Sequence, residues 1–225
     1  MTSPFPDDGR IRVAVLTGGH NFEVPQFHHL FREMDGVDAY IQSIENWAGD
    51  DARVRESYDV VVFYTMHITD PPSPELPWPE DSVREALEAL GSTSQGIVVW
   101  HHALVSYPEW DFWSDLVGIA ARKDFDYTHD VTCKAQIVDT SHPITEGLSP
   151  FDIVDETYTL EEPREGVHTL LTVDHEASMH AVAWVHEFRQ SRVFCLQLGH
   201  DSAAWKNESF RRLFKQGISW CARLD

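Results

Sequence analysis

The chain has 225 residues, of which 37 are Asp or Glu and 17 are Lys or Arg, giving a formal net charge of −20. This acidity argues against a nucleic-acid partner and against an anionic membrane surface, because both carry negative charge. There is no run of 18 apolar residues and no signal-peptide core in the first ten residues, so we expect a cytoplasmic protein without a membrane partner. The length suits a single α/β domain over residues 1–225, with residues 1–10 loosely ordered.

Apolar runs alternate with amphipathic segments through the first half of the chain, which is typical of a parallel sheet covered by helices. Strands are predicted at 11–16, 37–44, 58–64 and 97–100. Helices are predicted at 25–36, 82–91 and 108–116, the last of them rich in aromatic residues. Residues 70–79 contain five prolines and are expected to form a stiff surface loop.

The second half of the chain predicts further strands and a closing helix. The strands are expected at 131–139, 153–160 and 167–173, with a hairpin of 181–188 and 192–198, and the helix at 210–221. This pattern indicates one doubly wound α/β domain with antiparallel additions in its second half. Cys133, Cys195 and Cys221 form no CxxC pair and are expected to be buried thiols.

Histidines stand at or just beyond the ends of four predicted strands: His20, His67, the pair His101-His102, and His200. In an open parallel sheet the carboxyl ends of the strands border the ligand crevice, so at least two of these rings are expected to line one pocket. Imidazole takes and returns a proton near neutral pH and is a common metal ligand. No HExxH spacing is present, so a metal site would be assembled from separate loops. A single histidine taken alone is more often a surface residue or a satisfied core residue.

A second candidate segment contains two carboxylates and a tyrosine. Glu156 and Tyr158 share one side of a predicted strand, with Asp155 on the other side. A carboxylate that faces the crevice can act as a general base or hold sugar hydroxyls, whereas the alternative is an ordinary solvated strand face. Asp201 follows His200 directly and would either orient that imidazole or cap the next turn.

Several sequence signatures of other enzymes are missing. The sequence has no P-loop, no GxGxxG fingerprint and no GxSxG elbow, so no nucleotide cofactor is expected. The eight tryptophans, among them Trp100, would suit stacking on sugar rings, although an aromatic core is the more common role of any one of them.

Seven segments, taken in order, carry a family resemblance. They are residues 16–20, 58–62, 96–103, 142–148, 151–158, 192–194 and 198–201. On these segments the chain resembles the ThuA-like (trehalose utilisation) family over nearly its whole length. The resemblance implies the fold of class I glutamine amidotransferases: a flavodoxin-like three-layer sandwich whose mostly parallel sheet has helices on both faces and antiparallel additions in the second half.

The resemblance also bears on function, because the family is associated with catabolism of trehalose and related disaccharides, including their keto forms. The residues that match its motif positions are His102, His142, Asp155, Glu156, Tyr158, His200 and Asp201. His101-His102 occupies the turn where amidotransferases carry their cysteine, which argues against glutamine hydrolysis.

We therefore expect an enzyme that acts on a disaccharide or keto-sugar by proton abstraction next to a carbonyl, with a metal-dependent sugar hydrolase or a non-catalytic sugar-binding protein as alternatives. The expected catalytic residues are His102, Glu156, His200 and Asp201. The expected substrate contacts are Gly19, His20, Asn21, Trp100, Asp155 and Tyr158. The expected ligands for a divalent zinc or manganese ion come from His20, His67, His101 and His200. A homodimer is expected through the loop at 70–79 or the aromatic helix.

Overall fold

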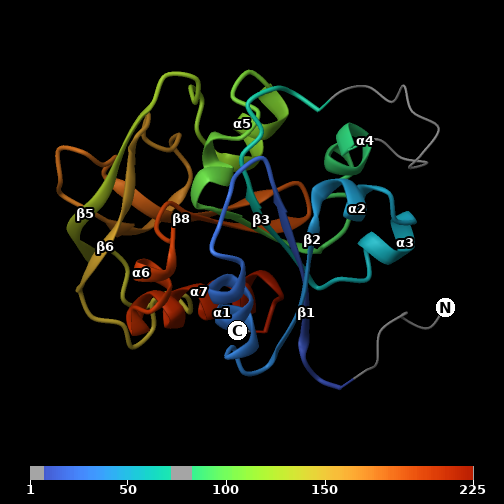
Figure 1. Cartoon of the computed structure of the whole chain (residues 1–225), viewed down its shortest axis with the longest axis horizontal. Helices are drawn as coiled ribbons and strands as arrows, with labels where there is room; N and C mark the ends of the chain where they lie inside the picture. Colours follow the sequence, from blue (N-terminus) through green and yellow to red (C-terminus); the bar gives the residue numbers. More distant parts are fainter. Residues whose placement is uncertain (1–7, 72–82, 225) are drawn as a thin grey trace.

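A computed structural model describes residues 8–71 and 83–224 (Figure 1). The strands are β1 (Ile11–Gly18), β2 (Val37–Ser43), β3 (Val60–Thr65), β4 (Gly96–Trp100), β5 (Asp126–Ile137), β6 (Phe151–Thr159), β7 (His168–Thr172), β8 (Ala181–Phe188) and β9 (Ser191–Leu196). The helices are α1 (Val24–Arg32), α2 (Ile44–Ala48), α3 (Ala52–Arg55), α4 (Val83–Glu88), the 3-10 helix η1 (His101–Val105), α5 (Asp111–Val117), α6 (Ser202–Trp205) and α7 (Glu208–Cys221).

The described strands form one sheet in the order β2-β1-β3-β4-β9-β8-β7-β5-β6. The first five strands of this order are parallel and follow the flavodoxin-like arrangement, with β9 in the place of the fifth strand. From β9 onward every pairing is antiparallel. The predicted flavodoxin-like α/β fold with antiparallel additions in the second half is therefore confirmed.

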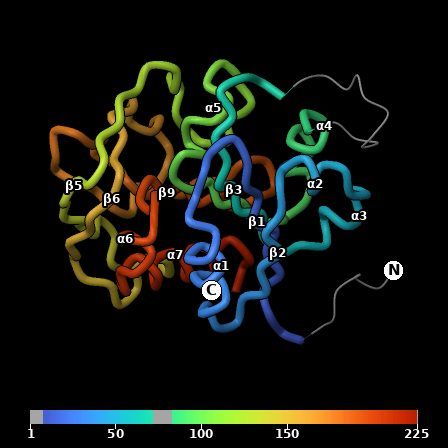
Figure 2. Tube along the Cα trace, viewed as in Figure 1, coloured from blue at the N-terminus to red at the C-terminus, as the bar shows by residue number. Residues whose placement is uncertain are grey.

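Helices cover both faces of the parallel half. α1 and α7 pack on one face, where the rings of Phe31 and Phe214 lie 6.0 Å apart between centroids. α2, α4 and α5 pack on the other face, and α5 places Trp113 in that core. Neighbouring residues of β1 serve the two cores, with Val15 in the first and Leu16 in the second, as strand alternation requires. Figure 2 shows α1 and α7 together near the centre of the view, apart from α4 and α5 above.

β5 and β6 form a two-stranded arm at the left of Figure 1. Only Gln136 and Ile137 of β5 pair with β7, whereas residues 126–128 and 131–135 pair with β6. The arm can therefore leave the plane of the main sheet. It brings Glu156 of β6 into contact with His101 and His200, which follow β4 and β9.

Some helices and strand ends differ from those that the sequence pattern predicts. α2 and α3 were not predicted, since each is about one turn and is held by a side-chain cap rather than by apolar spacing: Ser43 Oγ accepts from Asn46 N at 3.2 Å and Asp51 Oδ1 from Arg53 N at 2.8 Å. β5 begins at Asp126 rather than at 131, because pairing with β6 extends it through an exposed stretch.

The surfaces considered for a dimer are only partly described. Trp113 of α5 is fully buried and Trp110, which precedes α5, is 8% exposed, so both rings belong to this chain's own core. Residues 72–79 of the proline-rich loop and residues 1–7 lie outside the described residues, and the homodimer stays a prediction. The three cysteines are buried, as predicted. Among the described helices, none combines the length and apolar character needed to cross a membrane.

Candidate functional site

Four neighbouring parallel strands bring histidines to one edge of the sheet. β1, β3, β4 and β9 lie side by side, so their carboxyl ends meet. His20 follows β1, His67 follows β3, His101 starts η1 directly after β4, and His200 follows β9. The imidazole rings of His20 and His102 are 4.6 Å apart between centroids, those of His101 and His200 5.0 Å, and those of His20 and His200 5.6 Å.

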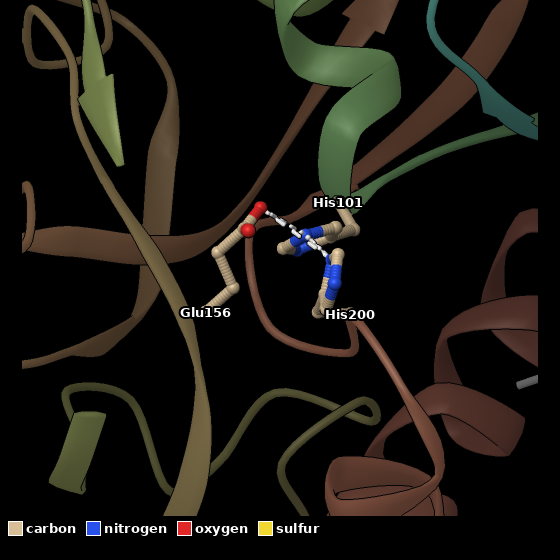
Figure 3. A group of neighbouring side chains, drawn as sticks. All are labelled: His101, Glu156 and His200. Atoms are coloured by element: carbon tan, nitrogen blue, oxygen red, sulfur yellow. Dashed lines mark hydrogen bonds and ion pairs between the residues drawn. The ribbon is translucent and has the colours of Figure 1, made fainter. Parts of the chain in front are cut away.

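Three side chains at this edge, those of His101, Glu156 and His200, form a cluster that converges on one point, as Figure 3 shows. His101 Nε2 lies 3.0 Å from His200 Nδ1 and 3.3 Å from Glu156 Oε1, and His200 Nδ1 lies 3.4 Å from the same oxygen. Among the described residues these three are the group whose ligand atoms gather closely enough to hold a metal ion. A tetrahedral zinc ion with bonds of about 2.0–2.1 Å keeps its ligand atoms about 3.3 Å apart, so the spacing fits such an ion.

His101 is fixed by its backbone and by both of its ring nitrogens. Its φ of 54° is left-handed, a conformation that costs a non-glycine residue about 1–2 kcal/mol and turns the chain sharply from β4 into η1. Nδ1 lies 2.5 Å from the carbonyl oxygen of Gln197, to which it must donate a proton, so Nε2 is the nitrogen that faces the cluster. The hydroxyl of Tyr158 lies 3.1 Å from Nε2.

Glu156 and Tyr158 share one side of β6, as predicted, since both reach His101. Burial raises the pKa of Glu156, but hydrogen bonds with His101 and Tyr158 outweigh it and bring the pKa to about 2. Burial and the neighbouring His101 ring lower the pKa of His200 to about 4. Burial raises the pKa of Tyr158 well above its usual value, so the phenol keeps its proton at neutral pH.

His102 is buried beside the cluster and presents a free lone pair. Its Nδ1–H donates to the carbonyl oxygen of Thr65 at 3.2 Å. Burial, followed by the nearby rings of His101 and His20, lowers the pKa of His102 well below its usual value, so the imidazole is neutral at pH 7. Nε2 is therefore an acceptor, and it has no hydrogen-bond partner in the described part of the chain.

Unpaired buried polar atoms are concentrated around this edge of the sheet. Besides His102 Nε2 they include His20 Nδ1, His67 Nε2, Thr65 Oγ1 and Gln197 Oε1, within the described residues. Each such atom costs about 1–3 kcal/mol if nothing hydrogen-bonds to it, so a group of them is typical of a place that takes water, an ion or a polar ligand.

Four predicted site residues lie at the first turn or beside it. Gly19 has a φ of 74°, and a Cβ there would collide with the carbonyl of Met66, so this position requires glycine. Asn21 is exposed. His67 stacks on Tyr107, with centroids 5.5 Å apart and an interplanar angle of 6°, and has no ligand atom in the His101, Glu156 and His200 group. His20 likewise lies outside that group, against His102 and His200.

Other predicted residues have structural positions that differ from the expectation. Trp100 is fully buried and donates through Nε1 to the carbonyl of Leu198, so it belongs to the aromatic core rather than to a substrate surface. Asp155 is 3% exposed and its carboxylate accepts from three backbone N–H groups, so it lies within the structure rather than on a substrate surface. Asp201 caps α6 by accepting from Ala203 N at 2.8 Å.

His142 lies away from the cluster, with its ring 5.3 Å from Trp220 between centroids. His129 was not among the predicted site residues, yet its Nδ1 lies 2.8 Å from Glu156 Oε2. It stands in a polar stretch beside a β-bulge, and a bulge has no reliable signal in the local sequence.

Comparison with known proteins identifies the family. The sequence matches the ThuA family model, described as trehalose utilisation, over residues 12–221, and no curated protein matches it. The structure is similar to a ThuA-like protein from Parabacteroides merdae (TM-score 0.71, 17% identity, covering 95% of this chain and 90% of that one) and to another from Bacteroides uniformis (TM-score 0.72, 14% identity, 96% and 93%). It is also similar to PurLQS from Thermotoga maritima (TM-score 0.58, 11% identity, 94% and 99%), a likeness of fold alone. Because the family model spans nearly the whole sequence, this chain belongs to the ThuA, trehalose utilisation, family.

Proposed function

We propose that this protein is an enzyme of carbohydrate catabolism that removes a proton next to the carbonyl of a keto-sugar or keto-disaccharide, with a divalent metal at His101, Glu156 and His200. The family assignment supports the carbohydrate class. The observation that carries the site is the convergence of two imidazole nitrogens and one carboxylate oxygen, at 3.0–3.4 Å from one another.

The donor set suits zinc or manganese, since two imidazoles and a carboxylate bind either ion. His101 has the outer contact that metal-bound histidines commonly make, because its Nδ1–H donates to a backbone carbonyl, that of Gln197. When bound, the ion would supply positive charge beside the oxygen of the substrate carbonyl. Protons compete with the ion for the same nitrogens, so metal affinity is expected to fall in acid.

His102 is the base in this proposal. Its Nδ1–H donates to the carbonyl oxygen of Thr65. Its Nε2 carries a lone pair beside the proposed metal site and has no hydrogen-bond partner among the described residues. The neutral imidazole takes the proton from the carbon next to the carbonyl. The imidazolium then has two outcomes. Returned to the former carbonyl carbon, the proton gives an isomer once the hydroxyl proton on the first carbon has passed to the former carbonyl oxygen. Returned to the glycosidic oxygen, the proton departs with that oxygen. The second outcome breaks the glycosidic bond and leaves an unsaturated keto-sugar.

Exchange of hydrogen with solvent tests this reaction directly. The protein, supplied with Mn²⁺ or Zn²⁺, is incubated with a panel of keto-disaccharides in D₂O, and deuterium at the carbon next to the carbonyl is measured by NMR. His102→Asn places an amide N–H where Nδ1 donates to Thr65 and removes Nε2. We expect at least about a 100-fold loss of exchange in this variant, the usual contribution of a general base.

The control for folding is thermal unfolding of the same variant, which retains the hydrogen bond to Thr65. Exchange that survives in His102→Asn would rule out this residue as the base. Product formation without any deuterium next to the carbonyl would instead favour metal-dependent hydrolysis of a sugar derivative, which the same three ligands would also suit.

A further inference from the structure

The arm that carries Glu156 contains a β-bulge directly opposite this residue. Thr128 pairs with Thr157 and Val131 pairs with Asp155, so β5 advances three residues where β6 advances two. Two residues of β5, His129 and Asp130, therefore lie opposite the single residue Glu156. Asp130 has a left-handed φ of 55°. A bulge of this kind redirects a side chain that regular pairing would point elsewhere.

The redirected side chain is that of His129, which contacts the outer oxygen of Glu156. His129 Nδ1 lies 2.8 Å from Glu156 Oε2, whereas Oε1 is the oxygen that faces His101 and His200. The imidazole is held from two sides, by the ring of Tyr127 at 5.3 Å and by that of His200 at 5.4 Å between centroids. The two carboxylate oxygens therefore have separate partners, and the rotation of the carboxylate is fixed.

We infer that His129 is a positioning residue for Glu156: its Nδ1–H donates to Oε2 and leaves Oε1 directed at the proposed metal site. This inference rests on the metal site of the proposed function. Outer contacts of this kind orient a ligand and change metal affinity without touching the ion.

The surroundings of His129 argue against a role in folding. Its side chain is 57% exposed and the carboxylate that it contacts is 6% exposed, so the contact lies at the outer boundary of the site. Because the His129 ring is open to water, its contact with Glu156 is screened and stabilises the fold less than a fully buried pair would. The left-handed backbone at Asp130 is therefore explained by the orientation that His129 gives to Glu156 rather than by a contribution to folding.

The test is titration of the whole protein with Zn²⁺ alone, against a competing chelator, for three substitutions of His129. The amide nitrogen of an asparagine occupies the place of Nδ1, whereas that of a glutamine occupies the place of Nε2. We expect His129→Ala and His129→Gln to weaken Zn²⁺ binding about 10-fold or more, and His129→Asn to remain within about 3-fold of the unmodified protein. Melting temperatures without metal should be the same in all three.

His168→Ala is the matched control, because His168 is similarly exposed, at 53%, and contacts Asp139 Oδ2 at 3.0 Å away from the cluster. It should leave Zn²⁺ affinity unchanged. Unchanged affinity in His129→Ala, together with lost affinity in Glu156→Gln, would overturn this inference alone. An equal loss in His129→Asn and His129→Ala would overturn it as well. An unmodified protein that binds no Zn²⁺ would overturn the proposed metal site and this inference with it.

Discussion

The buried carboxylate of Asp155 connects the strand that carries Glu156 to the loop that carries His200. It accepts from Gly199 N at 2.5 Å, from His200 N at 2.9 Å and from Glu156 N at 2.9 Å. Burial raises the pKa of Asp155 to about 6 and the three N–H donors oppose that rise, so the group is ionised at pH 7. The spacing of Glu156 and His200 therefore depends on Asp155, although its carboxylate contacts only their backbone N–H groups.

Asp155→Asn tests that dependence. The amide keeps one acceptor but turns an NH₂ group toward backbone N–H donors, so we expect a loss of about 2–3 kcal/mol in the free energy of unfolding. Zn²⁺ affinity should fall as well, because His200 is no longer held. Urea denaturation and metal titration measure the two effects. Asp152→Asn, an exposed position on the same strand, should change stability by less than about 0.5 kcal/mol, and equal effects of both substitutions would contradict the assignment.

At the scale of elements, the segment that follows His102 is held together by a buried guanidinium. Arg122 is fully buried and donates to the carbonyl oxygens of Leu104 at 3.1 Å, Ser106 at 2.5 Å and Tyr107 at 2.7 Å. Burial lowers the pKa of Arg122 to about 10, so it remains charged at neutral pH. Leu104 lies in η1, whereas Ser106 and Tyr107 lie in the link between η1 and α5, so the guanidinium connects the helix to the link.

Removal of this guanidinium should loosen η1 and α5 together. We expect Arg122→Met to lower the free energy of unfolding by about 3–5 kcal/mol, because several buried carbonyls lose their donor. Arg122→Lys should recover only part of that loss, since an ammonium lacks the planar fork that reaches several oxygens. Lys123→Met is the adjacent control: its pair with Glu109 is exposed and screened by water, so this substitution should change stability far less than Arg122→Met. Denaturation curves of the three variants measure these free energies. A small loss of stability in Arg122→Met would refute the role of the guanidinium in holding η1 and α5.

At the scale of the whole molecule, one buried and three half-buried histidines make stability depend on pH. Burial lowers the pKa of His67, His102, His186 and His200 below the usual 6.5, with that of His200 at about 4. Below pH 6.5 the unfolded chain therefore binds more protons than the folded chain, and acid favours unfolding. Asp155, with its raised pKa, opposes this trend only between about pH 4 and 6 and by one proton.

We expect the free energy of unfolding to be level between pH 7 and 8 and to fall from pH 6.5 to 5 in metal-free protein. His186 isolates one part of the slope, because its Nε2 donates to the carbonyl of Leu116 at 3.0 Å and lies outside the site. A glutamine keeps that donor without titrating, so His186→Gln should reduce the slope by up to about 1.4 kcal/mol per pH unit. Denaturation at pH 5, 6, 7 and 8 measures it; equal slopes in both proteins would contradict the account.

The elements of the parallel half are set by local sequence. Unbroken apolar runs predict β1, β3 and β4, and the histidines after them predict that imidazoles meet at one edge, since parallel strands end together. Alternation in β6 also predicts that Glu156 and Tyr158 share a side. Family membership was likewise evident from short motifs along the chain.

Which imidazoles meet which carboxylate was decided only by the tertiary structure. His101 rather than His102 enters the cluster because a left-handed φ turns it there, and Glu156 arrives on β6, the last strand in the order of the sheet. His129 joins through a bulge. The physical reason is common to all three: strand patterns arise from each residue's burial among its near neighbours, whereas convergence depends on turns and strand order that only the packed whole determines.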